Sequence, residues 1–256
     1  MKYRSNLRGL DLNAAKDKIV GFLRERSPKA GYVLGLSGGI DSAATFLLAN
    51  EAIGDRLTAM VLPDVEATPQ EDIDDAVDIA TYHGINHKLI NITPIIKLYS
   101  QYLPYDKLAL GNLKARVRMA LLYYEANVRG QLVLGTGDKS ELLLGYFTKY
   151  GDGAADLLPI VDVYKSELRE LATLLGVPNK IVQKKSSPRL WLGQDAEAEL
   201  GIEYTQADKI LVEIIERGTP IEEVQDKFGK EPVTRVYERY KNSTHKRAMP
   251  LYPKLI

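Results

Sequence analysis

The segment at residues 35–42, with the sequence GLSGGIDS, constrains this chain more than any other feature. It directly follows an apolar run at 31–36, and residues 40–50 then have the pattern of a helix. Two glycines allow a tight turn that brings backbone N–H groups close to a ligand. The first N–H groups of a helix are unpaired and carry positive partial charge. A strand, a glycine turn and a helix start in this order predict a phosphate-binding site.

The loop differs from the phosphate loop of kinases and GTPases, because it lacks the lysine of the G-x-x-x-x-G-K-S/T pattern. It carries Asp41 instead, and an acid at this place suits a magnesium ion that rides on a phosphate. The string resembles the pyrophosphate loop of enzymes that split ATP between its α and β phosphates. The structural alternative is an ordinary strand-to-helix turn with a serine cap.

Length and composition exclude several classes of protein. A chain of 256 residues allows one large α/β domain or two small ones. Lys plus Arg and Asp plus Glu balance at 34 each, so the net charge does not call for nucleic acid or a membrane surface as main partner. The sequence has neither a long apolar run nor an apolar signal-peptide core, and we expect a cytoplasmic location. The lack of cysteine excludes disulfides, thiolate metal sites and a cysteine nucleophile in this chain.

Strand and helix patterns alternate over the first half of the chain. Strands are predicted at 31–36, 57–62, 87–92 and 131–135, and helices at 11–26, 40–50, 68–83, 112–129, 164–175, 204–217 and 233–247. A capping box is expected at residues 68–71. The alternation predicts an α/β fold, a doubly wound parallel sheet with a helical C-terminal portion. One domain over residues 1–256 is the simplest interpretation.

A second acid follows the fourth predicted strand. In a doubly wound sheet, ligands bind at the carboxyl ends of the strands where the strand order reverses. If the first and fourth strands are neighbours, Glu141 on the first turn of the next helix could meet Asp41 around one metal ion. The alternative is that Glu141 is only a first-turn acid stabilised by the helix dipole.

Three later segments resemble those of NAD synthetases. Residues 135–159 (GTGDKSELLLGYFTKYGDGAADLLP) resemble that family's G-T-x-x-x-x-E and F-T-K-Y/F-G-D-G motifs. Residues 190–201 (LWLGQDAEAELG) resemble its L-W-x-G-Q stretch, and residues 243–247 (STHKR) its C-terminal H-K-R segment. The motifs keep the family's order, and the chain resembles the short, ammonia-dependent form because no amidase domain precedes residue 35.

The resemblance implies an adenine nucleotide α-hydrolase-like fold and a two-step reaction. The nicotinate carboxylate of deamido-NAD attacks the α-phosphate of ATP, and pyrophosphate leaves. Ammonia then displaces AMP from the adenylate to give NAD. The implied requirements are Mg²⁺, the substrates ATP, deamido-NAD and ammonia, and a homodimer with deamido-NAD bound at the subunit interface.

Site residues follow from the resemblance position by position. The residues implied to contact ATP are Gly35, Leu36, Ser37, Gly38, Gly39, Ile40, Asp41, Ser42, Thr136, Lys165 and Ser187. Those implied to contact deamido-NAD are Arg116, Lys149, Asp156, His245 and Lys246. Asp41 and Glu141 would hold the metal, and with Asp156 they are the predicted catalytic residues. Each has a structural alternative, such as a solvated helix face for Arg116 and Arg118, a helix surface for Lys165 and a turn cap for Asp156.

The chain departs from the family pattern at three places. Pro188-Arg189 replaces an Ala-Gly pair, Ala196 stands where an acid is usual, and Asp138 stands where Asn or His is more familiar. We expect Asp138 to lie off the metal. These departures affect the loop at 185–200 and leave the predicted phosphate and metal positions unchanged.

Two other functions stay open at this stage. A tRNA-thiolation or lysidine enzyme of the same loop class would favour a basic surface, and thiolation usually needs cysteine. A regulatory nucleotide-binding module would explain the phosphate loop but not the second acid loop or the segment at 147–153.

The long helix predicted at 112–129 bears on the quaternary structure. It carries apolar side chains on several sides, which need more than one packing partner: Leu113, Val117, Met119, Leu121, Leu122, Tyr123, Tyr124 and Val128. We expect a symmetric dimer that uses this helix, although the protein core could supply the second partner.

Overall fold

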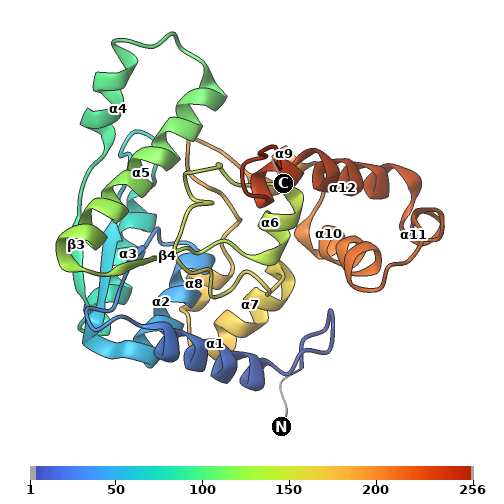
Figure 1. Ribbon diagram of the computed structural model, residues 1–256, viewed down its shortest axis with the longest axis horizontal. Coiled ribbons are helices and arrows are strands. Elements are labelled where there is room, and N and C mark those ends of the chain that lie inside the picture. The colour runs from blue at the N-terminus through green and yellow to red at the C-terminus, as the bar shows by residue number, and fades with distance from the viewer. Residues whose placement is uncertain (1–3, 255–256) are drawn as a thin grey trace.

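A computed structural model describes residues 4–254 of the chain. At its centre, four parallel strands lie in the order β3-β2-β1-β4 (Figure 1). Their bounds are Tyr32–Gly35 for β1, Leu57–Val61 for β2, Asn86–Leu89 for β3 and Leu132–Leu134 for β4. All four fall at predicted positions. Strand β4 lies beside β1 on the side away from β2, so the strand order reverses there, as a shared crevice requires.

Helices cover both faces of this sheet. Residues of α1 (Leu12–Arg26), α2 (Ile40–Ile53), α3 (Gln70–Tyr82) and α7 (Lys165–Leu174) share one core cluster with Tyr32 and Leu34. Residues of α4 (Thr93–Ser100) and α5 (Lys107–Arg129) share another with Val33. Successive side chains of β1 therefore point to opposite faces and are buried on both, which confirms the doubly wound α/β prediction.

The C-terminal portion is helical, as predicted, and has its own hydrophobic core. Figure 1 shows most of it in orange and red beside the sheet. Its helices, with bounds, are α6 (Lys139–Leu144), α9 (Ala196–Leu200), α10 (Tyr204–Leu211), α11 (Ile221–Phe228), α12 (Lys230–Asn242) and α13 (Thr244–Arg247). A π-helical turn, Val212–Glu216, extends α10, while a 3₁₀ turn, Gly54–Arg56, precedes β2 and α8 (Asn179–Val182) follows α7. The single domain predicted over 1–256 stays a prediction, and residues 1–3 and 255–256 lie outside the described residues.

Three predicted helix starts are wrong, and one of them is α12, which was predicted from 233 but begins at Lys230. Helix α5 begins at Lys107 because Asp106 caps it, with Oδ1 2.7 Å from the backbone nitrogen of Ala109. The capping box at 68–71 is absent: α3 starts at Gln70, Pro69 occupies the cap position, and Thr68 Oγ1 has no hydrogen-bond partner among the described residues. Across residues 4–254, no helix combines the length and hydrophobicity that a membrane crossing requires.

Candidate functional site

The glycine turn after β1 is held in one conformation by its own serines. Ser37 N donates to Ser42 Oγ at 3.1 Å, and Gly39 N donates to Ser37 Oγ at 3.3 Å. Gly38 has a φ of +77°, and a Cβ there would lie 2.1 Å from the carbonyl oxygen of Asp72. Only glycine fits this place, so the turn leads directly into α2 with its first N–H groups free for a ligand.

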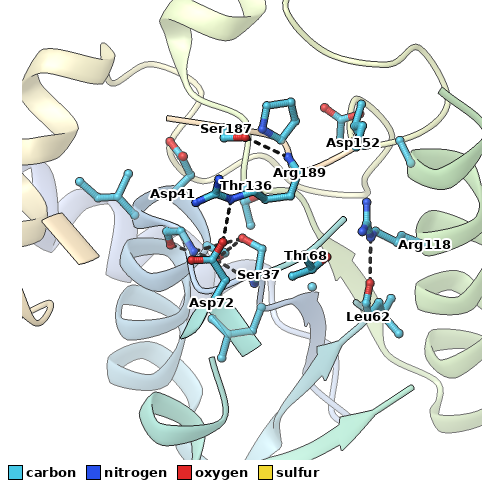
Figure 2. A pocket seen from close by; sticks show the side chains of 18 of the residues that line it. Ser37, Asp41, Leu62, Thr68, Asp72, Arg118, Thr136, Asp152, Ser187 and Arg189 are labelled. Carbon is cyan, nitrogen blue, oxygen red and sulfur yellow. Dashed lines mark hydrogen bonds and ion pairs between the residues drawn. The ribbon is translucent and has the colours of Figure 1, made fainter. Parts of the chain in front are cut away.

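A cavity of about 250 Å³ opens at the carboxyl ends of the strands. Apolar side chains of β2 and α5, including Met60 and Met119, form part of its wall. The segment at 184–190 forms another part (Figure 2). Nine of the residues predicted to contact ATP line this one cavity: Gly35, Leu36, Ser37, Gly39, Ile40, Asp41, Ser42, Thr136 and Ser187. The tertiary structure thus brings the two predicted loops and Ser187 together.

Three acids and one lysine meet beside the glycine turn, and we call them the acid-rich cluster: Asp41, Asp138, Glu141 and Lys165. Lys165 Nζ lies 2.5 Å from Asp41 Oδ1, 3.0 Å from Asp138 Oδ2 and 3.0 Å from Glu141 Oε1. The side chains of Asp138 and Lys165 are completely buried, whereas those of Asp41 and Glu141 are each 22% exposed. Asp41 and Glu141 line the cavity, so the cluster has an open side and a closed side.

Three helix starts converge to build this cluster. Asp41 is in the first turn of α2, and Lys165 is the first residue of α7. Asp138 caps α6: its Oδ1 accepts from Glu141 N at 2.8 Å, and Glu141 Oε2 accepts from Asp138 N. The backbone nitrogen of Lys165 donates to Ser140 Oγ at 2.8 Å, which fixes α7 against α6. Glu141 therefore serves the helix cap and the cluster at once, and Lys165 is not the surface residue of the structural alternative.

The excess of acid perturbs the protonation of the buried pair. Burial, together with the nearby Asp41 carboxylate, raises the pKa of Asp138 to about 7, although Lys165 acts in the opposite direction. Burial by itself would lower the pKa of Lys165, but Asp138, Asp41 and Glu141 outweigh it and raise that pKa above its usual range. Lys165 is therefore a permanent cation at neutral pH, and we exclude it as a base.

The acids of this cluster fit a magnesium ion. One oxygen each of Asp41, Asp138 and Glu141 lies within 4.8 Å of the others. Carboxylate oxygens are the protein ligands that Mg²⁺ prefers, usually one or two of them together with substrate phosphates. Asp138 already gives one oxygen to the cap of α6 and is closed off from the cavity. Asp41 and Glu141, which face the cavity, are therefore the pair best placed to hold the metal.

A second set of charges, which the sequence did not predict, lies beside the segment at 184–190, and three of its members, Asp72, Lys184 and Arg189, line the cavity. This base-rich cluster consists of Asp72, Asp75, Lys180, Lys184 and Arg189. Lys184 Nζ lies 2.6 Å from Asp72 Oδ1 and 2.5 Å from Asp75 Oδ2, and Lys180 pairs with Asp75. Arg189 Nε lies 2.7 Å from Asp72 Oδ2, as Figure 2 shows. Arg189 stood out in the sequence as a departure from the family pattern, but nothing in the sequence indicated that it would pair with Asp72 of α3.

The residues predicted for deamido-NAD lie outside the cavity wall. Three of them form a chain of contacts: Arg116 Nε donates to Lys149 O at 3.3 Å, and Lys149 Nζ to His245 O at 2.7 Å. Lys246, next to His245 in the sequence, donates from Nζ to the carbonyl oxygens of Gly145 and Phe147. Asp156 does not join them. Its Oδ2 accepts from Val133 N at 2.7 Å, and its exposed carboxylate does not line the cavity.

Arg118, two residues after Arg116, is a cavity residue instead. It lines the wall, and its Nε donates to the carbonyl oxygen of Leu62 at 2.8 Å (Figure 2). The structural alternative of a solvated helix face therefore fails for Arg118, while Arg116 is exposed. Helix periodicity alone did not separate these two arginines, because both faces of α5 carry polar and apolar residues.

Comparisons with known proteins agree with this geometry. The family model for NAD synthase matches residues 12–250. The NH(3)-dependent NAD(+) synthetase of Hyperthermus butylicus is 49% identical, covering 97% of this chain and 93% of that protein. Two solved structures cover 96% of this chain and all of the matched chain. NMN synthetase of Francisella tularensis has 34% identity and a TM-score of 0.84, and NH3-dependent NAD synthetase of Campylobacter jejuni has 29% identity and a TM-score of 0.82. With the glycine turn, the acid-rich cluster and the later motifs all within the matched range, the chain belongs to the NAD synthase family.

Proposed function

We propose that the protein joins ammonia to deamido-NAD in an ATP-dependent ligation that yields NAD, AMP and pyrophosphate. The nicotinate carboxylate forms a bond to the α-phosphorus of ATP as the bond to pyrophosphate breaks. Ammonia then adds to the carbonyl of the adenylate, AMP leaves, and the nitrogen loses a proton. The observation that carries this proposal is the acid-rich cluster beside the glycine turn, in a chain that matches the family over nearly its whole length.

In this reaction the protein has mainly to position the substrates and to neutralise negative charge. Transfer of a nucleotidyl group needs no protein nucleophile, and the chain contains no cysteine. The backbone N–H groups around Gly39 would bind the phosphates, and Asp41 and Glu141 would hold Mg²⁺. When bound, Mg²⁺ would offset the charge that develops on the leaving pyrophosphate. Arg189 and Lys184 would add positive charge near the segment that carries Ser187.

The nicotinate substrate would bind at a group of basic residues outside the cavity wall, which we call the rim: Arg116, Lys149, His245 and Lys246. This rim supplies cationic groups, which suit an anionic dinucleotide. Asp156 stays a prediction as a contact to deamido-NAD and as a catalytic residue. Because Asp156 is not among the residues that line the cavity, we favour a role in substrate binding over a role in the chemical steps.

A homodimer would place that rim at a subunit interface. Tyr124 and Val128 of α5 are 69% and 66% exposed, while Val117 of the same helix is buried. Arg116 is also exposed on α5. We therefore expect the side with Tyr124 and Val128 to pack against a second copy. Analytical ultracentrifugation should find a dimer at micromolar concentration that Tyr124→Asp converts to a monomer, and a monomeric parent protein would contradict this.

The reaction is tested by supplying ATP, Mg²⁺ and ammonium with deamido-NAD or without it. We expect NAD, AMP and pyrophosphate in equal amounts, formed only when deamido-NAD is present. Glutamine freed of ammonium should give little product. Release of ADP, or AMP formation that ignores deamido-NAD, would contradict the proposal. The latter result would favour the other ATP-splitting enzymes or a nucleotide-binding module.

Because one similar structure is an NMN synthetase, a second substrate should be compared with deamido-NAD. Nicotinate mononucleotide, the acid that corresponds to NMN, carries the same reacting carboxylate without the AMP half. We expect a higher kcat/KM for deamido-NAD, because the rim at Arg116 to Lys246 offers contacts beyond the cavity. A preference for the mononucleotide would assign the chain to that second activity. Because the reaction consumes ATP, a location in the cytoplasm stays part of the proposal.

A further inference from the structure

The acid-rich cluster already holds a cation of its own. Lys165 Nζ lies within 3.0 Å of an oxygen of each of its three acids, and these are the same acids that form the candidate metal site. An ammonium group and a divalent ion would compete for the same lone pairs and would repel each other at this distance. Lys165 and the metal therefore cannot occupy the cluster together in the arrangement seen here.

The surroundings of Lys165 limit where its ammonium group can go. The side chain is fully buried, and its Nζ lies 5.3 Å from the ring centre of the buried Tyr204. The Tyr204 hydroxyl has no hydrogen-bond partner among the described residues. If the ammonium left the acids without a new anion, it would become an unpaired buried charge, which is strongly unfavourable. The open side of the cluster, toward the cavity, is the direction in which phosphate oxygens would be available.

Asp138 differs from the other two acids in the way it is held. One of its oxygens accepts from Glu141 N in the cap of α6, the other faces Lys165, and its side chain has no exposed surface. It is thus suited to remain paired with Lys165 when Asp41 and Glu141 turn to another cation. Asp138 would be a positioning residue that acts through Lys165.

We propose that Lys165 excludes divalent metal from Asp41 and Glu141 until ATP arrives, so that metal and nucleotide enter together. This inference rests on the metal site of the proposed function. The phosphates would offer the ammonium new acceptors, Asp41 and Glu141 would then be free to hold the metal, and Asp138 would stay paired with Lys165. The cluster would therefore bind metal weakly in the absence of nucleotide, although it contains three acids.

The test measures binding of Mn²⁺ alone, without nucleotide, from the electron paramagnetic resonance signal of the free ion. Lys165→Met should bind Mn²⁺ at least tenfold more tightly than the parent protein, because the competing cation is gone. The double variant Lys165→Met/Asp138→Asn also removes the buried carboxyl group that pairs with Lys165, so it changes the charge of the cluster less than the single variant does. It should also bind more tightly than the parent, which separates competition from a simple change in charge.

Lys139→Met is the matched control. Lys139 lies next to Asp138 in the sequence but pairs with Asp162 and Glu216 outside the cluster, so Mn²⁺ affinity should stay at the parent value. Thermal unfolding with and without Mn²⁺ checks that each variant is folded. If Lys165→Met does not fold because its acids are uncompensated, the double variant decides.

Mn²⁺ affinity equal to or weaker than that of the parent in the folded variants would overturn the inference. Such a result leaves the ligation reaction untouched, because no substrate is involved. Conversely, tighter Mn²⁺ binding together with a failed ligation assay would reject the proposed function and retain the competition between Lys165 and metal.

Discussion

Two ion clusters line the same cavity, and they differ in the sign of their excess charge. The acid-rich cluster has three carboxylates and one lysine, whereas the base-rich cluster has two carboxylates and three cationic side chains. In both clusters, charged side chains of helices and of adjoining segments meet, and each cluster contains completely buried groups: Asp138 and Lys165 in the first, Asp75 in the second. The comparison separates a site that can accept a cation from a site that fastens one segment to another.

The consequences of this difference are opposite. In the base-rich cluster each carboxylate has two cationic partners, so no acid is left to attract a metal. Its pairs instead connect α3 to the segment at 184–190, next to the cavity. In the acid-rich cluster one ammonium is shared among three acids, so a divalent ion would satisfy them better. The balance of acids and bases thus favours metal binding in the acid-rich cluster. In the base-rich cluster it favours a structural role, the attachment of the segment at 184–190 to α3.

The largest effect on activity is expected from substitutions at the open side of the acid-rich cluster, where Asp41 and Glu141 face the cavity. Asp41→Asn and Glu141→Gln should each lower the rate of AMP formation about a hundredfold, which corresponds to about 3 kcal/mol of transition-state stabilisation. Each change is nearly isosteric at a partly exposed side chain, so the melting temperature should change little. AMP release at saturating Mg²⁺ is measured beside a melting curve. If Glu141→Gln keeps near-parental turnover, Glu141 serves only as the second member of the capping box of α6 and does not hold metal.

The matched change in the base-rich cluster is Lys184→Met, which should affect stability more than chemistry. Asp75 keeps Lys180 and Asp72 keeps Arg189, so we expect a loss of about 1–2 kcal/mol in the free energy of unfolding. Urea denaturation measures this loss. A hundredfold fall in the rate constant of the chemical step at saturating ATP would place Lys184 among the catalytic residues and remove the contrast between the clusters.

A smaller effect concerns the dependence of stability on pH. Burial raises the pKa of Asp138 to about 7, so its contribution to stability is largest below pH 3.8 and declines as the pH rises toward 7. Burial would also raise the pKa of Asp75, but hydrogen bonds from Lys180 and Lys184 outweigh it and lower that pKa. The contribution of Asp75 is therefore present above pH 3.8 and is lost as the pH falls below it.

Two variants separate these opposite dependences. Asp138→Asn should flatten the decline of the unfolding free energy between pH 4 and 7, which has a slope of at most about 1.4 kcal/mol per pH unit for one group. Asp75→Asn should flatten the acid side, below pH 4. Urea denaturation at several pH values measures both. Parallel pH profiles for the two variants would show that the clusters do not differ in this respect.

The smallest effect is expected at Arg189, a non-glycine residue with a φ of +51°. Arg189→Gly relieves the strain of the left-handed backbone but loses the ion pair with Asp72, so the unfolding free energy should change by less than about 1 kcal/mol. The KM for ATP should rise several-fold if the guanidinium meets phosphate. Lys180→Met, in the same cluster but outside the cavity wall, is the control. Equal KM values for both variants and the parent would limit Arg189 to a structural role.

The predictions from sequence succeeded where the signal was local. Strands β1, β2 and β4 were found because each is a short, largely buried apolar run, and the glycine turn because eight consecutive residues carry it. Strand β3 is mostly exposed and was found only approximately, at 86–89 instead of 87–92. Short helices such as α4, α8 and α9 were missed, since four to eight residues contain too little periodicity. The box at 68–71 was wrong because the cap position falls on Pro69, one residue after the threonine.

The sequence alone determined the strand–turn–helix unit proposed to bind phosphate, the family to which the motifs pointed, and Asp41 and Glu141 as candidate ligands. Only the tertiary structure decided which charges meet. Lys165 is 124 residues from Asp41 and 24 from Glu141, and Arg189 is 117 from Asp72. Local propensity acts over a few neighbouring residues, whereas an ion pair depends on where the whole backbone brings two side chains. The convergence of α2, α6 and α7 therefore buried Lys165 among three acids, whereas its sequence position alone favoured a helix surface and the family resemblance implied a contact with ATP.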